Sequence, residues 1–291
     1  MLKSMLNAIV KKAIGLLTQA IFPLFDTPLF RAIAKHLVRG LKPRKDIPIK
    51  VQEHKMYANS LDRIAALCLW KFSALEGFET RILQDIVKKE MVVVDIGANI
   101  GYYTLKLAKL VGEKGKVYAF EPAPDNFSLL IKNIKVNNYE NVFVVPKAVS
   151  NKTGKINLYL CVEHTGDHRI FDSHDGRKSI EIETVALDDF FSNNERIDFI
   201  KMDIQGAEYL ALTGMKNLIQ GNRKLIIISE LSPSLLLKCD YSGEEYLNKI
   251  IDYGFSIKFI NEKKELIESI SPEDLLRICS NENYVSLYLE R

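Results

Sequence analysis

The chain has 291 residues, a hydrophobic content of 47% and a formal net charge of +3. These values fit one large α/β domain with an appendage, and no apolar run is long enough for a membrane span. Four scattered cysteines without CxxC spacing argue against a disulfide framework and a zinc site, and they favour a reducing, cytoplasmic location.

Positive charge is concentrated in residues 1–50, which hold ten Lys or Arg against two Asp. Apolar residues recur at helical spacing through residues 2–17, opposite several lysines, and this pattern predicts a basic amphipathic helix. A second such helix is expected after Pro28. Because Lys11 and Lys12 interrupt the apolar stretch and no A-x-A site follows it, a secretory signal peptide is not expected.

Two alternatives are open for these helices. They cap the catalytic domain or a partner subunit of a homo-oligomer, or they bind a membrane surface through residues 1–40, at the inner face. Residues 42–60 carry prolines and mixed charge, which is typical of a connector. Residues 1–75 are therefore expected to form a basic helical N-terminal region with a connector, followed by one catalytic domain over residues 76–291.

A helix is expected at residues 81–89. Glu79 and Thr80 precede it, and either side chain would cap its first turn. Both residues are also candidates for contact with a cofactor.

Residues 91–107, MVVVDIGANIGYYTLKL, predict a buried parallel strand, a glycine turn and a helix. This is the first unit of a nucleotide-binding α/β sheet. Gly97 and Gly101 let the backbone approach a ligand, and Asn99 tolerates a left-handed conformation. A dinucleotide fingerprint would need a third glycine where Tyr102 stands, so a nicotinamide cofactor is disfavoured.

Polar residues stand at the ends of the first strands. Asp95 suits the positive ammonium and sulfonium of S-adenosylmethionine, whose carboxylate would take the free N–H groups of the following helix. The second strand ends at Glu121, where such folds place the acceptor for ribose hydroxyls. A third strand at residues 142–145 leads to Ala148 and Val149, at the edge where an adenine would lie.

A fourth strand at residues 197–202 brings Asp203 to the same edge, and this strand is expected to adjoin the first one. A helix should then run to Leu218, with Glu208 in its first turn; helix capping explains one of these two acids, but not both. The fifth strand ends in Glu230. A sixth strand and a closing strand, antiparallel at or near the sheet edge, complete the expected sheet.

Strand-like runs at residues 155–162 and 180–187 flank a polar loop and predict an inserted β-hairpin. His168 and Arg169 in this loop are candidates for binding the acceptor, since Arg suits carboxylate or phosphate groups. The spacing of its three histidines matches no metal motif, so no metal is predicted.

Taken in order, these motifs resemble the FkbM-type branch of S-adenosylmethionine-dependent methyltransferases. The matching segments are VVVDIGANIGYYT (92–104), FEP with Asn126 (120–126), PKAVS (146–150), GDHRI (166–170) and KMDIQGAE (201–208). The resemblance implies a Rossmann-like class I fold, with a seven-stranded, mostly parallel sheet whose strand 7 is antiparallel. It implies a donor held by the turn at residues 95–101 and by Glu121, with residues 203–208 near the transferred methyl group.

The predicted function is O-methylation of a hydroxyl on a small molecule or a sugar or glycan. The candidate catalytic residues are Asp203, Glu208, Glu230 and His168; His168, Arg169 and Gln205 are the candidates for acceptor binding. The expected cofactor contacts are Glu79, Thr80, Asp95, Gly97, Ala98, Asn99, Gly101, Tyr102, Tyr103, Thr104, Glu121, Pro122, Asn126, Ala148, Val149 and Asp203.

Three rival functions remain: a nicotinamide-dependent oxidoreductase, a class I enzyme that methylates nucleic acid, and a membrane-surface protein without enzyme activity. A nicotinamide-dependent oxidoreductase lacks its third glycine, and a membrane-surface protein without enzyme activity rests only on the basic helices. Nucleic acid is not an expected partner, because residues 51–291 are net acidic and carry no Asn/Asp-Pro-Pro-aromatic tetrad.

Overall fold

The computed structural model describes residues 46–58, 77–162, 164–191, 195–282 and 284–291. The two basic helices expected within residues 1–40, and most of the region before residue 76, lie outside these ranges. No helix in the described parts of the chain has both the length and the apolar character needed to cross a bilayer.

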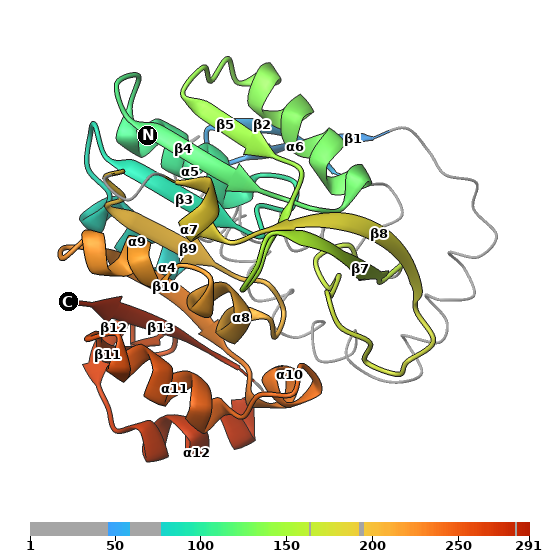
Figure 1. The fold of residues 1–291 in the computed structure, drawn as a ribbon. Helices are drawn as coiled ribbons and strands as arrows, with labels where there is room; N and C mark the ends of the chain where they lie inside the picture. The colour runs from blue at the N-terminus through green and yellow to red at the C-terminus, as the bar shows by residue number, and fades with distance from the viewer. Residues whose placement is uncertain (1–45, 59–76, 163, 192–194, 283) are drawn as a thin grey trace, which may run out of the picture.

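The core of the protein is an eight-stranded sheet with the order β12-β11-β13-β10-β9-β3-β4-β5 (Figure 1). Its strands are β3 (Val92–Ile96), β4 (Lys116–Phe120), β5 (Val142–Val145), β9 (Phe199–Met202), β10 (Ile226–Leu231), β11 (Ser256–Asn261), β12 (Leu266–Ser269) and β13 (Val285–Glu290). β3 pairs in parallel with β4 and with β9, so the first and fourth predicted strands are neighbours as expected. β13 runs antiparallel between β10 and β11, which confirms the antiparallel closing strand of the class I fold.

One strand of this eight-stranded sheet was not expected. β12 adds an eighth strand by pairing antiparallel with β11 at the sheet edge. Its side chains are largely exposed, with Leu266 and Ile267 at 54% and 38%, so the apolar pattern that marks a buried strand is missing.

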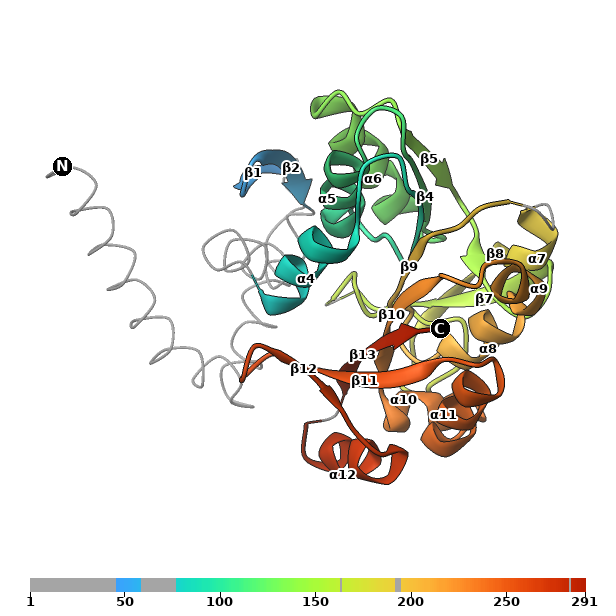
Figure 2. The same cartoon turned by 90° about the vertical axis from the view of Figure 1, so that its left-hand side faces the viewer.

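Helices cover both faces of the sheet (Figure 2). One face carries α4 (Phe78–Ile86), α5 (Tyr102–Val111) and α6 (Pro124–Val136), whose apolar residues pack with Val93, Val117 and Ala119. The other face carries α7 (Leu187–Phe190), α8 (Glu208–Thr213), α9 (Lys216–Gly221) and α11 (Gly243–Asp252). The remaining helices are α10 (Pro233–Lys238) and α12 (Pro272–Glu282). The central parallel strands are therefore buried on two sides, as their continuous apolar sequences require, whereas Phe143 of the outer strand β5 is 46% exposed.

The single helix expected to follow the turn at residues 203–208 and to run to Leu218 is two short helices, α8 and α9. The break falls at Gly214, where an added Cβ would lie 2.1 Å from the carbonyl oxygen of Ser150. This close approach of two backbones, and not the local helix propensity, ends α8.

A smaller sheet lies beyond the carboxyl ends of the parallel strands (Figure 1). It consists of β6 (Ala148–Val149), β7 (Gly154–Leu160) and β8 (Lys178–Val185), in the order β6-β8-β7. β7 and β8 form the predicted inserted hairpin, and they are antiparallel over seven residue pairs.

Residues 46–58, predicted to belong to a connector, are ordered as a hairpin of β1 (Ile47–Val51) and β2 (His54–Ala58) packed on α6. The side chain of Asn133 in α6 accepts from the backbone N–H of Tyr57 at 2.6 Å and donates to its carbonyl at 3.0 Å. The same amide donates to the carbonyl of Ile100 at 2.8 Å. Asn133 is fully buried, so it ties this hairpin to the glycine turn after β3.

Candidate active site

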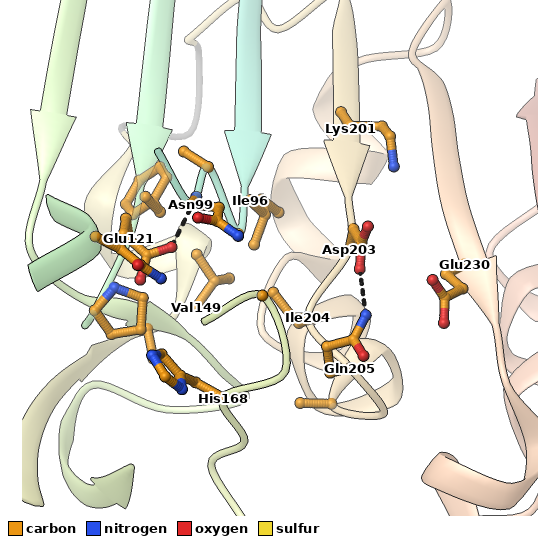
Figure 3. Close-up of a pocket in the computed structure, with 18 of the residues that line it drawn as sticks. Ile96, Asn99, Glu121, Val149, His168, Lys201, Asp203, Ile204, Gln205 and Glu230 are labelled. Atoms are coloured by element: carbon orange, nitrogen blue, oxygen red, sulfur yellow. Dashed lines mark hydrogen bonds between the residues drawn. The ribbon is translucent and has the colours of Figure 1, made fainter. Parts of the chain in front are cut away.

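A cavity of about 890 Å³ opens at the carboxyl ends of β3, β4, β9 and β10. Figure 3 shows Asn99 and Glu121 at one end, Asp203 and Glu230 at the other, and Ile96, Val149 and Ile204 between them. The cavity therefore has two polar ends joined by an apolar middle.

Most residues predicted for the site line this cavity: Glu79, Gly97, Ala98, Asn99, Tyr102, Tyr103, Glu121, Pro122, Asn126, Ala148, Val149, His168, Asp203, Gln205 and Glu230. Six predicted residues do not form its wall: Thr80, Asp95, Gly101, Thr104, Arg169 and Glu208.

The turn after β3 has the backbone conformation that its sequence predicts. Gly97, Asn99 and Gly101 have φ values of +84°, +50° and +97°. A Cβ on Gly97 would lie 2.0 Å from the carbonyl oxygen of Asp203, so the turn packs directly against the end of β9. The N–H groups of Gly97 and Ala98 both donate to the carbonyl of Phe120, which fixes the turn to β4.

Glu121 holds the neighbouring end of the cavity. Its carboxylate accepts from the backbone N–H of Asn99 at 2.8 Å and of Ala123 at 2.9 Å. Burial raises the pKa of Glu121 to about 7, although these hydrogen bonds favour the charged form. Close by, Asn126 donates to the carbonyl of Thr165, while its buried Oδ1 accepts no hydrogen bond from any described residue.

Asp95 lies beneath the turn and not on the cavity wall. It is 2% exposed, and its carboxylate accepts from the hydroxyl of Thr104 at 2.5 Å. Burial raises the pKa of Asp95 to about 6, and the hydrogen bond from Thr104 opposes this rise. In this structure Asp95 links β3 to the first turn of α5, and its direct contact with a cofactor stays a prediction.

The turn after β9 separates its two acids. Asp203 lines the cavity, and its Oδ1 accepts from the Gln205 side chain at 2.8 Å (Figure 3). Glu208 is fully buried and accepts from the N–H groups of Ile204 and Gly206, both at 3.0 Å. Burial raises the pKa of Glu208 to about 7. Glu208 thus stabilises the turn from inside, and it is Asp203 that the turn presents to the cavity.

Lys201 is a cavity residue that the sequence reasoning missed. It is 4% exposed, and its Nζ lies 3.5 Å from Oε1 of Glu79 and 4.9 Å from the centre of the Tyr103 ring. Burial lowers the pKa of Lys201, but the charges of Glu79, Asp203, Glu230 and Asp95 together raise it above its ordinary value. The signal that could have identified it is a lysine inside the otherwise apolar strand FIKM.

The loop between β7 and β8 forms the remaining wall. Nδ1 of His168 accepts from the backbone N–H of Cys161 at 3.0 Å, so in the neutral ring the proton is on Nε2. Arg169 instead pairs with Asp167 at 2.7 Å, and Arg177 pairs with the same carboxylate at 2.7 Å. Arg169 therefore shapes this loop, and His168 is the member of the pair that reaches the cavity.

Comparison with known proteins agrees with this architecture. The family model of the FkbM methyltransferase domain matches residues 95–257. The hexuronic acid methyltransferase AglP of Haloferax volcanii is 28% identical over 166 residues, covering 55% of this chain and 65% of that protein. The 2-O-methyltransferase NoeI of Sinorhizobium fredii is 28% identical over 190 residues, covering 59% of this chain and 74% of that protein.

A solved FkbM methyltransferase from Methylobacillus flagellatus is similar with a TM-score of 0.40 and 17% identity, covering 91% of this chain and 60% of that one. The family match confirms the FkbM resemblance drawn from the sequence motifs, and with it the expectation of S-adenosylmethionine as the cofactor. The chain belongs to the FkbM methyltransferase family.

Proposed function

We propose that the protein transfers a methyl group from S-adenosylmethionine to a hydroxyl of a small molecule or a sugar or glycan. One observation carries this proposal: a carboxylate, Asp203, shares one cavity with Glu121 and faces it across an apolar middle. The names of two relatives, a hexuronic acid methyltransferase and a 2-O-methyltransferase, support a sugar as the acceptor.

The residues at the Glu121 end fit the nucleoside part of the donor. The Glu121 carboxylate would accept from ribose hydroxyls, and the unpartnered Oδ1 of Asn126 would accept from an adenine amino group. Ala148 and Val149 offer an apolar surface for the base. Gly97 lets the glycine turn pack closely against the backbone carbonyl of Asp203, an approach that a side chain would block.

The donor supplies an activated methyl group when it is bound, so the protein mainly has to align two ligands and accept one proton. Alignment of two reactants in one cavity accounts for several kcal/mol of rate enhancement, roughly 7–11 in the most favourable cases. Asp203 is the residue best placed to accept the proton of the acceptor hydroxyl. Glu230 is the second candidate, whereas His168 carries its neutral-form proton on Nε2 and is better suited to donate a hydrogen bond.

The test has two parts. Calorimetric titration of the purified protein with S-adenosylhomocysteine should give one binding site per chain. Incubation with S-adenosylmethionine and a panel of methyl glycosides should then give a mass increase of one methyl group on an oxygen, located by fragmentation. Absence of S-adenosylhomocysteine binding, or methylation on nitrogen or carbon only, would contradict the proposal. Membrane contact through residues 1–40 and homo-oligomerisation remain predictions.

A further inference from the structure

The end of the cavity away from Glu121 is rich in carboxylates. Glu79, Asp203, Glu230 and Glu262 line it together with Lys201, while the other lysine of the cavity, Lys147, pairs with Glu183. The charge of Lys201 already faces Glu79 at 3.5 Å. Burial, together with the charges of Asp203 and Glu208, raises the pKa of Glu230 well above its ordinary value, although Lys201 opposes this rise. A ligand anion placed at this end would add to the repulsion among these carboxylates.

Two of these carboxylates are held by the protein itself. Glu262 accepts from the backbone N–H groups of Phe78 and Glu79 at 3.0 and 2.9 Å, at the start of α4. Oε2 of Glu79 accepts from the hydroxyl of Ser286 at 2.8 Å. These hydrogen bonds join α4 to β13 and to the loop after β11, and they hold this wall of the cavity in place.

Other acceptor atoms at this end have no hydrogen-bond donor among the described residues. Oε1 of the buried Glu79 is one of them, and its contact is the ion pair with Lys201 at 3.5 Å. The described residues give the Glu230 carboxylate no hydrogen bond, and Asp203 uses one oxygen for Gln205. The wall thus offers hydrogen-bond acceptors in excess of donors, and a ligand rich in donors would satisfy them.

We propose that this end of the cavity is an acceptor subsite for polyhydroxylated ligands without negative charge, such as neutral or amine-bearing hexosides, and that Glu230 excludes uronic acids and sugar phosphates. The inference rests on the proposed function and narrows it to one class of acceptor. It adds a specificity role for Glu230 that is separate from proton transfer by Asp203. Placing like charges together weakens the binding of an anionic ligand more than it strengthens the binding of a neutral one.

The test compares acceptors that differ only in charge. Methyl hexosides of the gluco, galacto and manno series are each used in three forms: neutral, 2-amino and uronate. Binding to the full chain saturated with S-adenosylhomocysteine is measured by saturation-transfer NMR, and kcat/KM for methyl transfer is measured by mass spectrometry. Within the series that is accepted, the neutral or amino form should exceed the uronate by about tenfold or more in both readouts.

The variant Glu230→Gln removes the charge and keeps the shape. It should raise the ratio of uronate to neutral kcat/KM several-fold, while the Kd for S-adenosylhomocysteine stays within about twofold of that of the unchanged protein. Glu140→Gln, at an exposed position away from the cavity, is the matched control and should leave the ratio unaltered.

The outcomes separate the two proposals. If S-adenosylhomocysteine does not bind, the proposed function fails and this inference fails with it. If it binds but no hexoside of any charge binds or is methylated, only the inference is overturned. If a neutral hexoside is methylated but its uronate binds or reacts equally well, only the inference is overturned. An unchanged ratio in a folded Glu230→Gln variant would likewise overturn the role of Glu230.

Discussion

The hydroxyl of Thr104 donates a hydrogen bond of 2.5 Å to the carboxylate of Asp95, and both side chains are shut off from solvent. Asp95 lies next to the last residue of β3, and Thr104 lies in the first turn of α5, the helix that follows the glycine turn. The acid that the motif places before the glycines therefore fixes the geometry of the turn, and the ligand meets the backbone that this bond holds in place.

Thr104→Val should test this bond, since it removes the hydroxyl and keeps the volume. We expect the free energy of unfolding to fall by about 1–3 kcal/mol, because a buried carboxylate loses its donor. The loss should be larger at pH 8 than at pH 5, since the pKa of Asp95 is about 6 and the acid is neutral at the lower pH. Urea denaturation at both pH values measures it.

Thr213→Val serves as the control for this variant. The Thr213 hydroxyl bonds only to the carbonyl of Tyr209 within its own helix. Its loss should cost under about 1 kcal/mol at either pH. Equal losses in the two variants would contradict the special role given to Thr104.

Gly97→Ala should abolish donor binding. The new Cβ would overlap the Asp203 carbonyl at 2.0 Å, and the residue would also keep a φ of +84°. Gly176→Ala has a similar φ of +76° but open space around its Cβ, so it should show only the backbone cost of about 1–2 kcal/mol. Titration with S-adenosylhomocysteine and thermal melting compare the two; normal binding by folded Gly97→Ala would refute the close-approach argument.

Asp203→Asn should lower kcat by about 10²- to 10⁴-fold, the range expected for loss of a general base. Donor affinity should change by only a few-fold, because the amide retains an oxygen that can accept from Gln205. Single-turnover methyl transfer and calorimetry separate the two effects. The exposed Asp252→Asn is the control, and unchanged turnover in Asp203→Asn would remove Asp203 from the mechanism.

Donor affinity should depend on pH through Glu121. Burial raises the pKa of Glu121 to about 7, so its carboxylate is mostly protonated at pH 6 and mostly charged at pH 8. Because the charged form accepts hydrogen bonds at both oxygens, affinity for S-adenosylhomocysteine should weaken about tenfold from pH 8 to pH 6.

Two variants locate this dependence. Glu121→Gln should bind more weakly and lose most of the slope. Glu208→Gln should keep the slope, because the pKa of Glu208 is also about 7 but its carboxylate lies outside the cavity wall. A slope that persists in Glu121→Gln would assign the titration to another group.

The parallel centre of the sheet was predictable because its strands are buried on both faces and appear as continuous apolar runs. The hairpin at residues 46–58 was not, because IPIKV and HKMYA are short and carry lysines and a proline. Side chains in and after α6 hold them: Asn133 bonds to the backbone of Tyr57, 76 residues away along the chain, and Asn137 bonds to the backbone of Lys55. The residue pattern within these two strands does not identify a partner so distant in sequence.

The same limit applied within the site. The motifs placed Glu121 and Asp203 in one cavity, since strand ends meet at one edge of a parallel sheet. They did not reveal which side of a turn an acid occupies, so Asp95 and Glu208 were expected in the cavity although both are directed inward. That direction is decided by backbone N–H and hydroxyl donors that only the folded turn brings together.

The amide of Asn133 has a practical consequence for where this domain can be cut. Truncation at the start of the family match, or at residue 76, would remove the Tyr57 backbone from a fully buried side chain and leave it bonded to Ile100 alone among these partners. The glycine turn would then lose the support of the β1–β2 hairpin, to which Asn133 links it. The minimal autonomous unit of this chain accordingly begins upstream of Ile47, and shorter versions should prove unstable before they prove inactive.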